Sequence, residues 1–77
     1  MSDSHADMLT ARAAVTEALD EAAVLRDLLG LVFWAAEHIP GDRGAALARG
    51  ALMAQDRLDL LMTRLEAARQ QLSPNSG

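Results

Sequence analysis

His38 is the one residue placed among groups that could move a proton, since it follows Glu37 and precedes Asp42 by four positions. Proton-transfer catalysis also needs a nucleophile and an orienting group within reach. The two long stretches that flank His38 contain no serine, cysteine or tyrosine. A histidine at a helix C-terminus is also favourable in its own right, because its charged form complements the helix dipole. We therefore expect the protein not to be an enzyme.

Metal and cofactor chemistry have equally little support in the sequence. The chain has no cysteine, and its two histidines, His5 and His38, are far apart with no cluster at ligand spacing. A structural metal site would need such a cluster. We expect no metal, no cofactor and no small-molecule substrate.

Two surface features could instead recognise another protein. Glu17, Asp20, Glu21 and Asp27 form an acidic stretch, which is either an ordinary solvated face or a surface for a basic partner. Trp34, next to Leu31 in the helical pattern, is the exception on an otherwise polar face. It either covers the end of a helical bundle and contacts a partner subunit, or acts as a binding hot spot. The predicted partner-binding residues are Trp34, Leu31, Asp20, Asp27 and Glu17.

The elements that position these residues are two long helices. Apolar residues recur at alternating spacings of three and four, first from Met8 to Ile39 and then from Leu47 to Leu72. Between them, Pro40 and Gly41 should end one helix and reverse the chain, and Asp42 should cap the next. We expect one all-α domain over 1–77, with helices over about 5–39 and 43–72, a turn at 40–42 and a polar tail at 73–77.

The register of the hairpin follows from residue size. If the helices fold back antiparallel and facing residue numbers add up to 83, large residues face small ones along almost the whole seam. Ala22 then faces Leu61, and Leu29 faces Ala54.

A second apolar stripe would remain exposed on a single hairpin. A chain of 77 residues has a small core, and extended apolar patches usually mark an interface. We therefore expect two antiparallel hairpins to form a homodimeric four-helix bundle, with the relative direction of the hairpins open. The predicted dimer interface comprises Val24, Leu28, Leu31, Ala35, Met53 and Leu60.

Composition and charge narrow the partners further. The net charge is −4, and no segment resembles a signal peptide or is apolar for long enough to span a bilayer. We expect a cytoplasmic protein that does not bind membranes. Nucleic-acid binding is disfavoured because it requires a basic face.

The layout resembles that of the plasmid copy-control protein Rop, a short helical hairpin that dimerises into a four-helix bundle. The resemblance is one of architecture. RNA binding in that family uses a basic and aromatic outer face on the first helices, whereas the first helix here is acidic.

Two hypotheses for function follow. The first is a non-enzymatic protein-interaction module, a homodimeric regulator or inhibitor that binds another protein; a phage or mobile-element inhibitor would be a special case. The alternative is a Rop-like bundle that binds RNA or other nucleic acid through Arg43, Arg49, Arg57 and Arg64.

Overall fold

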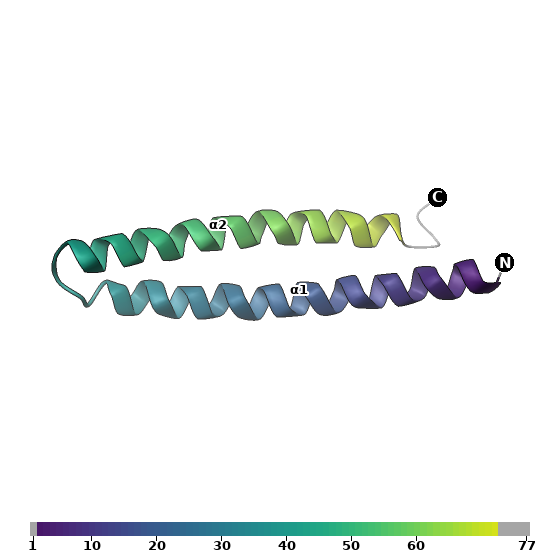
Figure 1. The fold of residues 1–77 in the computed structure, drawn as a ribbon, viewed down its shortest axis with the longest axis horizontal. Helices are drawn as coiled ribbons and strands as arrows, with labels where there is room; N and C mark the ends of the chain where they lie inside the picture. The colour runs from purple at the N-terminus through teal and green to yellow at the C-terminus, as the bar shows by residue number, and fades with distance from the viewer. Residues whose placement is uncertain (1, 73–77) are drawn as a thin grey trace.

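Two helices packed side by side make up the fold (Figure 1). This computed structural model describes residues 2–72, with side chains described from residue 4 onward. Helix α1 spans Ser2–Ala36 and helix α2 spans Gly41–Gln71. They run antiparallel and form a rod of 61 × 17 × 13 Å. The predicted all-helical hairpin is confirmed, and the predicted tail at 73–77 lies outside the described residues.

Helix α1 ends at Ala36, three residues before the predicted end at Ile39. The chain then tightens: the amide N–H groups of His38 and Ile39 donate to the carbonyls of Ala35 and Ala36, three residues back. Because Pro40 disfavours the α conformation at the residue before it, the helix cannot continue through Ile39. Tighter bonds of this kind commonly close the last turn of a helix.

Helix α2 begins two residues earlier than predicted. Pro40 is extended, with φ −73° and ψ 155°, and occupies the N-cap position without a side-chain cap. The predicted capping role of Asp42 is therefore wrong: Asp42 lies inside the first turn, where its charge complements the helix dipole. The predicted role of Gly41 holds, because its φ of +84° is a conformation that glycine adopts without steric cost.

Burial divides the predicted seam into two halves. In heptad notation, the a positions are Met8, Val15, Ala22, Leu29 and Ala36 on α1 and Gly44, Ala51, Leu58, Leu65 and Leu72 on α2. All of these are buried or half-buried. The d positions are Ala11, Ala18, Leu25, Val32 and Ile39 on the first half of the chain and Leu47, Ala54, Leu61 and Ala68 on α2. Most of these are exposed. The two helices therefore contact each other through one flank of the apolar stripe, and the other flank is uncovered.

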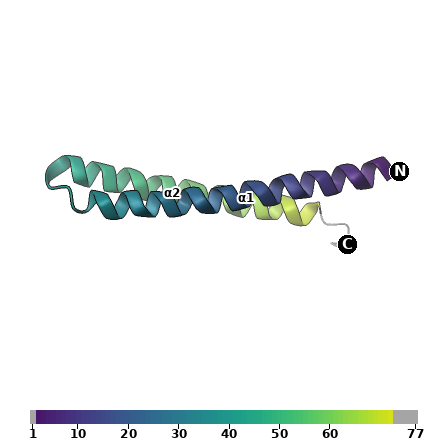
Figure 2. The same ribbon diagram turned by 90° about the horizontal axis from the view of Figure 1, so that it is seen from below.

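The register agrees with the size-based prediction. Arg26 bonds to both Gln55 and Asp59, so it lies level with the midpoint between them, at residue 57. Residue numbers 26 and 57 add up to 83. In this register the end of α2 lies level with residues 11 and 12, so the beginning of α1 extends past it (Figure 2).

Overpacking the seam should destabilise the hairpin. Ala22 is 4 % exposed at an a position, so Ala22→Leu should lower the free energy of unfolding by about 1–3 kcal/mol. The matched control is Ala13→Leu, at an exposed, outward f position of the same helix, which should not be destabilising. Urea denaturation followed by circular dichroism at one protein concentration measures both. Equal losses in the two variants would contradict this account of the seam.

Candidate interaction surface

One side of the hairpin carries a continuous apolar surface, which we call the open face. It consists of the apolar d and g positions of both helices between the turn and Leu61, with the g positions Arg43 and Arg57 interspersed on the α2 side. The apolar members are Leu25, Leu28, Val32, Ala35, Ile39, Leu47, Gly50, Ala54 and Leu61. Residues three and four apart lie on one side of a helix, so each set forms a stripe. All of these except Ala54 are exposed, and Leu28 is 50 % exposed. No large hydrophobic residue in the described chain is fully buried.

The residues predicted for the dimer interface are all exposed, as an interface on an isolated hairpin must be. Leu28 and Ala35 lie on the open face itself. The other four, which are Val24, Leu31, Met53 and Leu60, occupy c positions just beyond its rim. Whether they contact a second chain stays a prediction.

Sequence reasoning assigned several open-face residues to the hairpin seam, among them the large side chains of Leu25, Val32, Leu47 and Leu61. They are between 38 % and 46 % exposed. The heptad pattern marks a and d positions as apolar without showing that a single neighbouring helix covers only one of them. The available signal for which flank the hairpin covers was the apolar e positions Leu19, Phe33 and Met62, which are half-buried in the structure.

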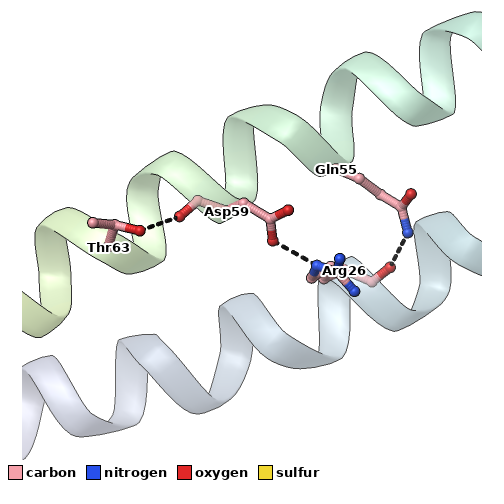
Figure 3. A network of polar contacts seen from close by, with 4 residues as sticks. All are labelled: Arg26, Gln55, Asp59 and Thr63. Atoms are coloured by element: carbon pink, nitrogen blue, oxygen red, sulfur yellow. Dashed lines mark hydrogen bonds and ion pairs between the residues drawn. The ribbon is translucent and has the colours of Figure 1, made fainter.

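The opposite flank of the hairpin carries a network of paired polar residues at mid-length (Figure 3). Arg26 Nε donates to Asp59 Oδ1 at 2.5 Å, and Gln55 Nε2 donates to the backbone carbonyl of Arg26 at 3.2 Å. Thr63 Oγ1 donates to the Asp59 carbonyl. Gly30 leaves room for Gln55, since a Cβ there would lie 3.4 Å from its amide nitrogen. These bonds are consistent with the register, and sequence reasoning did not find them.

The ion pair between Arg26 and Asp59 is exposed on both partners and contributes modestly to stability. The hydrogen bond from Arg26 to Asp59, together with the Asp59 charge, raises the pKa of Arg26 above its ordinary value. A raised pKa on a cation gives stabilisation that is present below the unfolded pKa and lost only as pH rises through the folded one. This pair therefore adds no pH dependence near neutrality.

The predicted partner-binding residues lie along the outer surface of α1. Asp20, Asp27 and Trp34 are seven residues apart at f positions, so they form a line about 21 Å long on the side away from α2. Glu17 and Leu31, at c positions, lie between this line and the open face. All five are exposed, and Trp34 is 64 % exposed.

His38 and Trp34 form one local cluster at the turn. The edge of one ring meets the other, with centroids 4.9 Å apart. The tightening after Ala36 leaves the Trp34 carbonyl without an amide donor, and His38 Nδ1 takes that place at 2.9 Å. This is the role of a residue that completes a helix end. It fits the structural interpretation of His38 rather than a catalytic one.

The acidic stretch borders a shallow surface hollow of about 340 Å³ lined by Glu17, Asp20, Glu21 and Val24. It opens where the open face ends. Among residues 2–72 no three histidine, aspartate or glutamate side chains are grouped as a metal site would require. Neither α1 nor α2 is apolar over a sufficient length to cross a membrane.

Comparison of the chain with protein-family models, with curated proteins and with solved structures finds no match to any of them. The functional argument therefore depends on the geometry of this chain.

Proposed function

We propose that this chain is a non-enzymatic interaction protein that works as a homodimeric four-helix bundle and regulates or inhibits another protein by binding it. The open face carries the self-association. The outer surface of α1, with Trp34, Leu31, Asp20, Asp27 and Glu17, binds the other protein, and its charge favours a basic partner.

The exposed area supports self-association. A compact monomer of this mass exposes about 4,500 Å², whereas the hairpin exposes 5859 Å². The excess of about 1,300 Å² is in the range that a stable homodimer buries on each partner. The surface available for this is the open face, which is rich in leucine.

The burial pattern supports a bundle in particular. A helix in a four-helix bundle has two neighbours, and it meets them with the two flanks of its apolar stripe. In the hairpin each helix uses its a flank on the other helix, while the d and g flank is uncovered. A second hairpin laid on the open face would give every helix its second neighbour.

The nucleic-acid alternative is weakened by the same geometry. Arg43, Arg57 and Arg64 lie at g positions beside the open face, where a second hairpin would cover or neutralise them. Of the four arginines proposed for that role, Arg49 alone is at an outward f position. Mobility of an RNA duplex at low salt should therefore be unchanged by the protein.

Sedimentation equilibrium tests the proposal directly. The chain has a mass of 8.2 kDa, so a dimer should sediment at about twice that value at micromolar concentration. A helical species that stays at the monomer mass up to about 100 µM would overturn the proposal, because the concentration scale of a stable homodimer lies well below this.

Trp34 should be dispensable for the fold and required for binding. Because its side chain is 64 % exposed on the outer surface, Trp34→Ala should leave helical content and dimer mass unchanged. If it anchors the other protein, its loss should weaken that binding by about 2 kcal/mol or more. Circular dichroism and sedimentation supply the first measurement, and a binding titration with the cognate partner supplies the second. A dissociated or melted variant would assign Trp34 to the bundle end instead.

A further inference from the structure

The charges and side-chain sizes along the open face indicate how a second copy lies on it. Two symmetric arrangements bring the open faces of two hairpins together. With both turns at one end, α1 packs against α2 of the second copy. With the turns at opposite ends, α1 packs against α1 and α2 against α2.

Charge distinguishes the two arrangements. Toward its N-terminus, the α1 stripe continues into Glu21 and Glu17, whereas the α2 stripe contains Arg57 and Arg64. Among the described residues the ion pairs are Arg26 with Asp59 and Glu66 with Arg69. Glu17, Glu21, Arg57 and Arg64 take part in neither pair, so they are available to a second copy. Turns at opposite ends would pair α1 with α1 and α2 with α2, so neither the acids nor the arginines of the stripes would find an opposite charge on the facing stripe, whatever the offset. Turns at one end place acids beside arginines.

The positions of these charges along the helix axis also favour the arrangement with both turns at one end. With the turns level, Arg64 of the second copy lies between Glu17 and Glu21 in height, beside the hollow that these residues line with Val24. A long guanidinium side chain suits that acidic hollow, because it can bond to two carboxylates at once.

Side-chain size points the same way. The α1 stripe is large at Leu28 and Val32, whereas the α2 stripe is small at the same heights, at Ala54 and Gly50. With the turns level, Val32 lies opposite Gly50 and Leu28 opposite Ala54. A Cβ at Gly50 would meet nothing within 4 Å in the single hairpin, so this space is free for a second copy. Large against small fills an interface, whereas large against large does not.

From the complementary charges and side-chain sizes of the two stripes we infer that two copies of the chain associate through their open faces. Both turns lie at the same end, and each α1 lies against the α2 of the other copy. The inference rests on the proposed homodimer and specifies its geometry. It also places both Trp34 side chains at the same end of the bundle.

Spin labels measure the arrangement. The chain has no cysteine, so Asp42→Cys and Gln70→Cys each give one unique site. Both positions are exposed f positions on α2, near its two ends. They are 28 residues apart, which corresponds to about 42 Å along the helix. Each single-label variant is measured by pulsed dipolar spectroscopy, first alone and then diluted with unlabelled chain to show that the coupling is between copies.

We expect both variants to give an intermolecular distance below about 35 Å, because diagonal helices of a bundle lie close together at every height. With turns at opposite ends, the two copies of α2 run in opposite directions. The axial separation between the two labels at position 42 and that between the two labels at position 70 then add up to at least twice the label separation of about 42 Å, so at least one variant must give an intermolecular distance above about 40 Å. That result would overturn the inference and leave the homodimer intact. The absence of any dipolar coupling in both variants would mean a monomer and would overturn the proposed function as well.

Discussion

Leu28→Glu should convert the dimer to a monomer, with a dissociation constant at least about 100-fold higher than that of the wild type. Leu28 lies at the centre of the open face and is 50 % exposed in the single hairpin. In the dimer each copy would place one new carboxylate among apolar side chains, and the cost of desolvating that charge opposes association even though Arg57 of the second copy lies at a similar height. The monomer should also be less helical at micromolar concentration, because the large side chains of the open face return to water.

Leu52→Glu is the matched control for this change. Leu52 is 46 % exposed, nearly the same as Leu28, but it lies at a b position on the polar side of the hairpin. The same substitution there should leave the sedimentation mass unchanged. If Leu28→Glu remained a dimer, or if both variants dissociated equally, the open face could not be the specific contact.

Gly44→Ala should cause the largest loss of stability within a single hairpin, on the order of 3 kcal/mol. Gly44 is buried where α2 leaves the turn. A Cβ at this position would lie 1.9 Å from the Ile39 carbonyl oxygen and 2.9 Å from that of Ala36. These are backbone atoms that no rotamer change can move away. The turn itself would have to shift, and with it the two bonds that close α1.

Gly30→Ala separates this clash from the general effect of replacing a helical glycine. Its added Cβ would meet only the flexible amide of Gln55 at 3.4 Å. Removing a glycine from a helix interior usually gains about 0.5–1 kcal/mol. Gly30→Ala should therefore be neutral or stabilising in urea denaturation at the same protein concentration. A Gly44→Ala variant as stable as Gly30→Ala would show that the turn is not packed as described.

The sequence alone determined the two helices, their antiparallel pairing and their register. Each depends on information that is local or periodic. Pro40 and Gly41 define a reversal through backbone sterics, and the heptad pattern defines which residues are apolar on each helix. Residue sizes selected the sum of 83 on the assumption that a positions face d positions. The axial register agrees, but the expected pair Ala22 and Leu61 is not buried together, because Ala22 is 4 % exposed and Leu61 is 45 % exposed.

Only the tertiary structure decided which flank of the stripe the hairpin covers. Two helices meet along a narrow line, so they cannot bury a and d positions equally, and the crossing geometry determines which set is uncovered. Leu25 and Leu61 were therefore expected inside and are exposed. The choice of Pro40 over Asp42 as the cap and the steric role of Gly44 were likewise hidden, because they depend on where the chain passes after Ala36. The heptad pattern shows which residues are apolar on each helix, whereas the packing of the two helices determines which of these residues are buried.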